Sequence, residues 1–168
     1  PVDLILAFNT FCDLLDPEDA KKCALLMHTQ ISDPNGTDLM AVKRAICPKY
    51  KVLFSNQSID TKMLNFYYNA ADITVNIASN EGFGISWNES LHTGTPIINN
   101  VTGGLQDGCR FEDENGKWIE FDTHFPSNHD GTYKKHANWA KPVFPACRSV
   151  QGSPVTPYIF DDRCDFRD

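Results

Sequence analysis

The first 55 residues place apolar side chains at two different spacings. Residues 1–15 show helical spacing, which predicts a helix with the apolar positions Leu4, Ala7, Phe8, Phe11, Leu14 and Leu15. Residues 23–28 and 51–55 are short apolar runs that predict strands, the first of them buried. Residues 38–46, between the two runs, have apolar positions on one helical face, and a polar turn is expected over residues 17–22.

The same alternation continues to residue 98. Helical spacing returns over residues 60–71 and 85–92, and strand patterns over residues 72–78 and 96–98. Strands and helices that alternate in this way predict an α/β fold with an open, mostly parallel sheet and helices on both faces. A chain of 168 residues fits one domain, so residues 1–168 are predicted to form a single domain.

The pattern changes after Gly103 and Gly104. Residues 111–139 are predicted to be a polar insertion, because they are rich in Asp, Asn, Gly and His. Three of these residues, His124, His129 and His136, are five and seven positions apart, which matches no common zinc pattern. We therefore expect these histidines to lie in a solvated loop, and no metal site is predicted.

Charge and composition limit the classes of binding partner and the compartment that can be expected. The chain has 15 Lys and Arg against 22 Asp and Glu, a formal charge of −7, and no basic cluster, so nucleic acid is not an expected partner. No apolar run is long enough to cross a bilayer, and whether the chain associates with a membrane is left open. Six cysteines occur without any Cys-x-x-Cys pair, so we expect thiols in a reducing, cytoplasmic compartment.

The strongest candidate chemistry is the segment from Glu81 to Glu89. It has the sequence Glu-Gly-Phe-Gly-Ile-Ser-Trp-Asn-Glu and joins a predicted strand to a predicted helix. Ligands bind beyond the carboxyl ends of strands in such sheets, and free N–H groups at a helix N-terminus attract phosphate. Glu81 can equally be a helix-start carboxylate and Glu89 a solvated helix-face residue.

Residues 69–98, followed by Gly103-Gly104, closely resemble the nucleotide-sugar half of retaining GT-B glycosyltransferases, and glycosyltransferase family 4 in particular. The mark of that family is a Glu, seven residues and a second Glu, with Gly-Phe-Gly after the first. Glu81 and Glu89 fill these positions, and the Gly-Thr-Pro turn at residues 94–96 stands at its usual distance. The resemblance implies a Rossmann-like fold, the C-terminal half of a GT-B enzyme.

The resemblance also implies roles for single residues. Glu81 would be the catalytic residue and contact the transferred sugar, and Glu89 would accept hydrogen bonds from the ribose hydroxyls. The remaining donor-binding residues would be Gly82, Phe83, Gly84, Ile85, Ser86, Gly103 and Gly104. The implied activity is transfer of a sugar from a nucleoside diphosphate to an acceptor sugar or glycoconjugate, with retention of configuration and without a metal or other cofactor.

Two features depart from the family pattern. The Arg and Lys that bind the diphosphate in the family stand in a loop that would precede residue 1, and the acceptor-binding N-terminal half has no counterpart. We therefore expect a fragment of a two-domain enzyme that binds its donor weakly and catalyses little alone. A non-catalytic nucleotide-binding or interaction domain that kept the fold is the alternative. An NAD-dependent enzyme is disfavoured, because Gly82-Phe-Gly84 lacks the third glycine of the dinucleotide motif.

Overall fold

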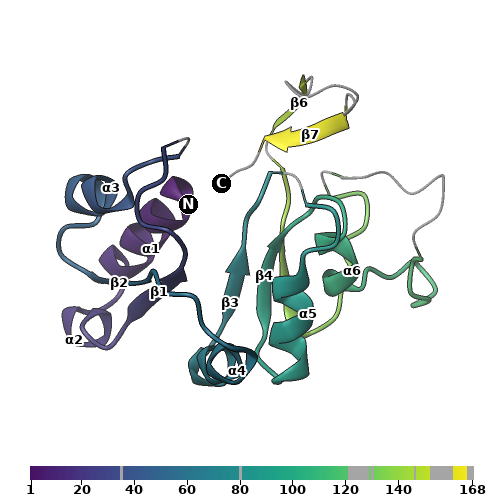
Figure 1. The fold of residues 1–168 in the computed structure, drawn as a ribbon. Helices are drawn as coiled ribbons and strands as arrows, with labels where there is room; N and C mark the ends of the chain where they lie inside the picture. The colour runs from purple at the N-terminus through teal and green to yellow at the C-terminus, as the bar shows by residue number, and fades with distance from the viewer. Residues whose placement is uncertain are drawn as a thin grey trace. The chain divides into compact units, whose positions relative to one another are not determined.

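A computed structural model of the chain describes residues 1–34, 36–79, 81–120, 129, 131–145, 147–151 and 161–165. The structure is of the α/β class, with helices and parallel strands in small sheets (Figure 1). It comprises two compact units, Pro1–Ile59 and Asp60–Asp168, which are called unit 1 and unit 2 below and described separately.

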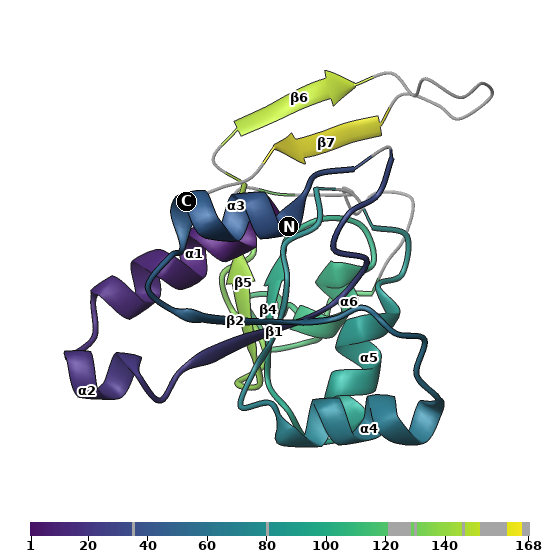
Figure 2. The same ribbon diagram turned by 60° about the vertical axis from the view of Figure 1, so that its left-hand side comes forward.

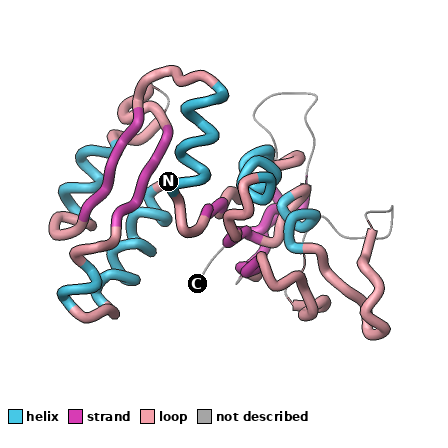
Figure 3. Tube along the Cα trace, turned by 90° about the horizontal axis from the view of Figure 1, so that it is seen from below, coloured by secondary structure: helices cyan, strands magenta, loops and turns pink. Residues whose placement is uncertain are grey.

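Unit 1 is a pair of parallel strands with its helices. Its elements are α1 (Val2–Asp13), α2 (Pro17–Ala20), β1 (Ala24–His28), α3 (Leu39–Ile46) and β2 (Lys51–Ser55). Strands β1 and β2 run side by side in Figure 3, with Ala24 opposite Lys51 and His28 opposite Ser55. Helices α1 and α3 contact each other and contribute Ile5 and Leu39 to the core of the unit (Figure 2).

The prediction of a strand at β1 is confirmed, but the strand is buried on one side only. Met27 is buried in the core of unit 1, and Leu25 packs against that core. Leu26, between them, is 42% exposed, and so is its register partner Leu53. Successive side chains of a strand point to opposite faces, so α1 and α3 cover only one face of this two-stranded sheet.

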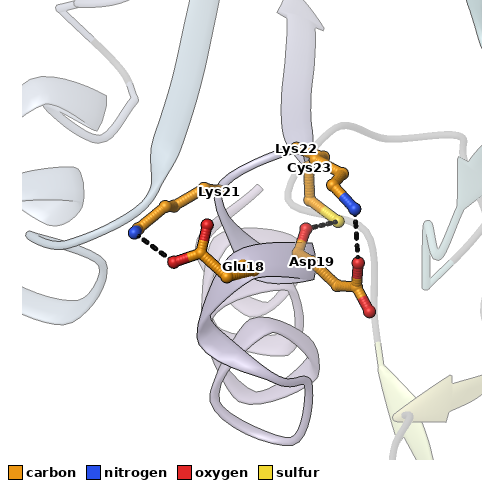
Figure 4. A network of polar contacts seen from close by, with 5 residues as sticks. All are labelled: Glu18, Asp19, Lys21, Lys22 and Cys23. Carbon is orange, nitrogen blue, oxygen red and sulfur yellow. Dashed lines mark hydrogen bonds and ion pairs between the residues drawn. The ribbon is translucent and has the colours of Figure 1, made fainter.

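The predicted polar turn after α1 contains the short helix α2. Pro17 stands at its first position, where a missing N–H costs nothing, and Glu18 and Asp19 lie in its first turn. Figure 4 shows the ion pairs that follow, Lys21 Nζ to Glu18 Oε1 at 2.6 Å and Lys22 Nζ to Asp19 Oδ1 at 2.7 Å. All four side chains are largely exposed, so these pairs stabilise the helix only slightly.

Unit 2 holds the segment with the candidate chemistry. Its elements are α4 (Thr61–Ala70), β3 (Thr74–Asn76), α5 (Ile85–His92), β4 (Ile97–Asn100), α6 (Leu105–Cys109), β5 (Ala140–Val143), β6 (Cys147–Gln151) and β7 (Asp161–Asp165). Strands β3, β4 and β5 form a parallel sheet in that order, and β6 pairs with β7 antiparallel. Helices α5 and α6 pack against the parallel sheet (Figure 1).

Most predicted elements are present. The helices predicted over 1–15, 38–46, 60–71 and 85–92 are α1, α3, α4 and α5, and the strands predicted over 51–55, 72–78 and 96–98 are β2, β3 and β4. Helix α6 was not predicted, because five residues are too few to show helical spacing. Strand β5 was also missed, since Pro142 interrupts its apolar pattern. The antiparallel strands β6 and β7 were missed because neither sequence shows the apolar alternation of a strand.

The core of unit 2 contains part of the predicted polar insertion. Phe111 is 2% exposed and His129 is 1% exposed, with their ring centroids 4.7 Å apart in an edge-on contact. Tyr133 meets His129 at 5.2 Å between ring centroids. The expectation that His129 lies in a solvated loop was therefore wrong, because aromatic side chains from distant segments enclose it. His124 lies outside the described residues.

Two further properties follow from the described part of the chain. Cys12, Cys23, Cys47 and Cys109 are free thiols. Burial raises the pKa of the Cys109 thiol to about 12, which keeps it protonated. None of the described helices is long and apolar enough to cross a membrane.

Candidate functional site

The candidate site lies at one edge of the parallel sheet in unit 2. Asn76, the last residue of β3, pairs in register with Asn99 near the end of β4. Because the strands are parallel, the segments that follow β3 and β4 leave the sheet at the same edge. Residues 81–84 follow β3, and residues 103–104 follow β4, so the topology brings the two predicted glycine segments together.

Backbone hydrogen bonds join these two segments. The Gly104 N–H donates to the carbonyl oxygens of Glu81 and Gly82, at 3.2 and 2.9 Å. The Thr102 hydroxyl donates to the Ser79 carbonyl at 3.3 Å, and Asn100 Nδ2 donates to the Ala78 carbonyl at 2.9 Å. Asn100 at the end of β4, together with Thr102 and Gly104 after it, therefore holds the segment that leaves β3.

Gly103 and Gly104 are glycines for a steric reason. A Cβ on Gly103 would stand 1.9 Å from the Glu81 carbonyl oxygen, and Gly103 has a φ of +46°. A Cβ on Gly104 would stand 2.4 Å from the Gly82 carbonyl oxygen. Real Cβ atoms do not come so close to backbone, so any side chain at either position would separate the two segments.

Gly84 begins α5 under a similar constraint. Its φ of +80° is left-handed, and a Cβ there would stand 2.5 Å from Leu105 Cδ2. Trp87 packs beneath this turn, and its Nε1 donates to the Phe83 carbonyl at 2.7 Å. The indole also lies against Gly108, where a Cβ would stand 2.8 Å from the ring.

The outer side of the turn is open. A Cβ on Gly82 would meet nothing within 4 Å, and Phe83 and Ile85 are 50% and 65% exposed. No hydrogen bond among the described residues uses the N–H groups of Phe83, Gly84, Ile85 or Ser86. The Ser86 hydroxyl accepts from Asn76 Nδ2 at 3.0 Å, which ties the first turn of α5 to the end of β3. Phe83 and Ile85 therefore carry unused backbone donors at exposed positions, whereas Gly84 is buried between them.

The two glutamates have different surroundings. Glu81 is half-buried, and its Cγ would lie 3.1 Å from a Cβ on Gly84, inside the turn. Glu89 is half-buried on α5, and its Oε2 accepts a hydrogen bond from the Tyr68 hydroxyl of α4 at 2.9 Å. Burial and this hydrogen bond raise the pKa of Tyr68 well above its usual value, so the phenol stays protonated and acts as the donor.

Glu89 and Tyr68 line a groove of about 180 Å³ between α4 and α5. Its other lining residues are Thr61, Leu64, Asn65, Asn88, His92 and Thr93. The run Phe66-Tyr67-Tyr68 does not by itself reveal which of the three rings faces α5. His92 is exposed and lines the same groove, with its Nδ1 2.8 Å from the Asn88 carbonyl oxygen.

The Gly-Thr-Pro turn at residues 94–96 fixes α4 against α5. Thr95 is 5% exposed, and its hydroxyl donates to the Tyr68 backbone carbonyl at 2.8 Å. The buried Ser90 hydroxyl lies within hydrogen-bond distance of the Thr95 carbonyl and of the Thr74 hydroxyl, at 3.0 and 2.8 Å. These contacts set the position of the Tyr68 backbone relative to α5.

The predicted site residues thus form two groups. The turn is made by residues 81–86, with Gly103 and Gly104 against it. The Glu89 side chain instead accepts a hydrogen bond from Tyr68 of α4. Among the described residues no group of three or more His, Cys, Asp or Glu side chains is placed to hold a metal ion.

A larger hollow, of about 330 Å³, lies in unit 1 and holds none of the predicted site residues. It follows the carboxyl end of β1 and is lined by Pro1, Thr29, Gln30, Asp33, Gly36, Thr37 and Leu39. Its size exceeds that of the groove beside Glu89, but its lining residues include a single carboxylate, Asp33, rather than a pair. The turn in unit 2 is therefore the better candidate on its chemistry.

Comparisons of the chain with models of protein families, with curated proteins and with solved structures give no match.

Proposed function

We propose that this chain binds the nucleoside-diphosphate sugar of a retaining glycosyltransferase similar to family 4, with a Rossmann-like arrangement that forms the donor half of a GT-B fold. The proposal rests on one observation above the others. A glycine turn at the carboxyl edge of a parallel sheet leaves the N–H groups of residues 83–86 without a partner among the described residues, and a glutamate stands at each end of its segment. The resemblance of residues 69–98 to family 4 supports the same conclusion.

The diphosphate would lie on the outer side of the turn. Open N–H groups at the start of α5 and the positive end of its dipole attract phosphate oxygens. Gly82 leaves room for a close approach, since nothing stands within 4 Å of where its side chain would be. In transfer, the bond from the anomeric carbon to the diphosphate oxygen breaks with both electrons on that oxygen, and the same N–H groups stabilise the charge that develops there.

The two carboxylates would bind the two ends of the donor. Glu81 stands in the turn and would contact the transferred sugar, while Glu89, four residues into α5, would accept from the ribose hydroxyls. The acceptor, a sugar or glycoconjugate, would be bound by another half of the enzyme. Its hydroxyl oxygen would form the new bond to the anomeric carbon, and the hydroxyl proton would pass to the departing diphosphate oxygen. Because the proposed electrostatic stabilisation comes from N–H groups, the proposal requires no metal.

Titration of the isotopically labelled chain with UDP, GDP and their sugars, followed by NMR, tests the proposal. We expect the amide signals of residues 82–86 to shift with at least one nucleotide. Glu89→Ala should weaken that binding about tenfold, since it removes hydrogen bonds to a charged group. Glu114→Ala, an exposed carboxylate, is the matched control and should leave binding unchanged. Absence of shifts in the turn with every nucleotide would contradict the proposal.

A non-catalytic interaction domain is the second candidate, and the exposed apolar side chains of the turn favour it. Phe83 and Ile85 are 50% and 65% exposed at the mouth of the site, which suits contact with another protein. The variant Glu81→Ala separates the two candidate functions when the rate of sugar transfer is measured on a form of the protein that is active in that reaction. A catalytic role predicts a loss of activity by orders of magnitude, and an interaction role predicts none.

A further inference from the structure

We infer that Tyr68 is a positioning residue for Glu89: its hydroxyl holds one carboxylate oxygen, so that the other is presented to the ribose hydroxyls of the donor. The inference rests on the proposed function and adds a residue that the glutamate-and-glycine motif does not include. Tyr68 belongs to a different helix and stands 21 positions before Glu89.

The contact between the two side chains defines the orientation of the carboxylate. The Tyr68 hydroxyl lies 2.9 Å from Glu89 Oε2, and both residues are half-buried. The described residues donate no hydrogen bond to Glu89 Oε1. A carboxylate accepts about four hydrogen bonds, so one oxygen can hold the tyrosine while the other receives a ligand.

The tyrosine can impose this orientation because its own position is fixed independently of Glu89. Its backbone carbonyl accepts from the buried Thr95 hydroxyl at 2.8 Å. Thr95 is linked in turn to Ser90, one residue after Glu89 on α5. One hydrogen-bond network therefore links the backbone of Tyr68 to the part of α5 that carries Glu89. The Glu89 carboxylate is already oriented in the chain without ligand. Such preorganisation strengthens binding by lowering its entropic cost.

The surroundings indicate which part of the donor is bound. The groove is lined by hydroxyl and amide side chains as well as Glu89, and it has no Lys or Arg among its lining residues. A wall of hydroxyl and amide groups with one carboxylate, and without Lys or Arg, suits vicinal hydroxyls better than phosphate. The diphosphate belongs instead at the open amides of residues 83–86.

The test compares nucleotides with and without the hydroxyls that Glu89 would bind. Binding of UDP and of 2′,3′-dideoxy-UDP, and of the corresponding guanosine pair, is measured by calorimetry on the wild-type chain and on Tyr68→Phe. We expect Tyr68→Phe to weaken binding of the ribonucleotide about five- to tenfold and to leave the dideoxynucleotide unchanged. The control variant Tyr67→Phe removes the phenol oxygen from the neighbouring position and should change the affinity for neither nucleotide.

A double variant separates positioning from a general effect on the fold. In the Glu89→Ala background, Tyr68→Phe should cause no further loss, because its only effect passes through the carboxylate. If Tyr68→Phe weakens both nucleotides equally, or weakens the ribonucleotide in that background too, the inference is wrong.

A measurement on the wild-type chain tests the same inference without a variant, and so remains available if Tyr68→Phe does not fold. The Cζ resonance of Tyr68 should move on addition of whichever of UDP and GDP binds and stay in place with its 2′,3′-dideoxy analogue, and no movement with the bound ribonucleotide overturns the inference. If the wild-type chain binds UDP in preference to its dideoxy analogue but Tyr68→Phe keeps that preference, only the role of Tyr68 fails. If it binds neither UDP nor GDP, the proposed function fails first and takes the inference with it.

Discussion

At the scale of single residues, the candidate site depends on the absence of side chains. Gly103 and Gly104 let the segment after β4 touch the backbone of Glu81 and Gly82. The turn that carries the open amides is therefore held by neighbours that contribute no functional group of their own. Glycines of this kind determine where the amides point.

Gly103→Ala should destabilise the chain by about 3 kcal/mol or more, since the new Cβ would overlap the Glu81 carbonyl oxygen and the φ of +46° is unfavourable for alanine. Gly82→Ala is the matched control. Its Cβ would meet nothing within 4 Å, so its effect should stay within about 0.5 kcal/mol. Urea denaturation followed by circular dichroism measures both, and equal effects would show that the two segments are not in contact.

The hydrogen bond of Tyr50 predicts that the stability of unit 1 depends on pH. Its hydroxyl donates to Asp13 Oδ1 at 2.6 Å, and this hydrogen bond, together with desolvation, raises the pKa of Tyr50 from 10.0 to about 12. A phenol whose pKa is raised by folding contributes stability that is complete below the unfolded value. That contribution is lost as the pH rises from about 10 to about 12.

NMR titration of the Tyr50 ring signals from about pH 8 to about pH 13, a range that includes the reference tyrosine pKa near 10, measures this pKa. Asp13→Asn should lower the midpoint toward the ordinary tyrosine value, since the amide cannot accept with a full negative charge. An unchanged midpoint in Asp13→Asn would show that the hydrogen bond is not its cause.

At the scale of elements, two helices of the described structure begin on an aspartate that caps them. Asp38 accepts from the Ala41 N–H at 3.0 Å at the start of α3, and Asp60 accepts from the Met63 N–H at 2.7 Å at the start of α4. Asp16 precedes α2 but makes no side-chain cap hydrogen bond. The same residue type therefore has different effects at three helix starts.

Asp38→Ala should cost about 1 kcal/mol, because it leaves an N–H of the first turn of α3 without its acceptor. Asp16→Ala is its counterpart within unit 1 and should cost clearly less. Thermal unfolding of the two variants, compared with the wild-type chain, measures the difference. A larger loss for Asp16→Ala would contradict the assignment of the cap.

At the scale of the whole molecule, each unit has a core of its own. Ile5, Met27, Leu39 and Cys47 form the buried centre of unit 1, and Ile97, Val101, Cys109, Phe111 and Ala140 form that of unit 2. The open turn lies in unit 2 and is supported by residues of that core, because Trp87 packs both under the turn and against the core.

Ile5→Ala should destabilise unit 1 by about 2–5 kcal/mol, since Ile5 is fully buried and its truncation leaves a cavity. Leu14, near the end of the same helix, is 81% exposed, and Leu14→Ala should change stability by less than about 0.5 kcal/mol. Hydrogen exchange of the β1 and β2 amides reports the loss of protection. Similar loss in both variants would contradict the burial of Ile5.

Several elements could be predicted because their signals are local. The glycines and capping aspartates act within a few residues of themselves, so the sequence places the starts of α3, α4 and α5 within a residue or two. His129 shows the opposite case. The residues directly beside it in the sequence are polar, but Phe111 and Phe144 pack against it, and no local pattern reports contacts between segments so far apart.

The sequence by itself determined that a strand, a glycine turn and a helix follow one another between residues 72 and 92, and that Glu81 and Glu89 stand at the two ends of one segment. Periodicity and the backbone freedom of glycine suffice for that, because both act within one or two helical turns. Only the tertiary structure decided that Gly103 and Gly104 close on Glu81 and that Tyr68 faces Glu89. Both contacts depend on how parallel strands align and how α4 is rotated against α5, and these are set by packing across the fold rather than by neighbours in the chain.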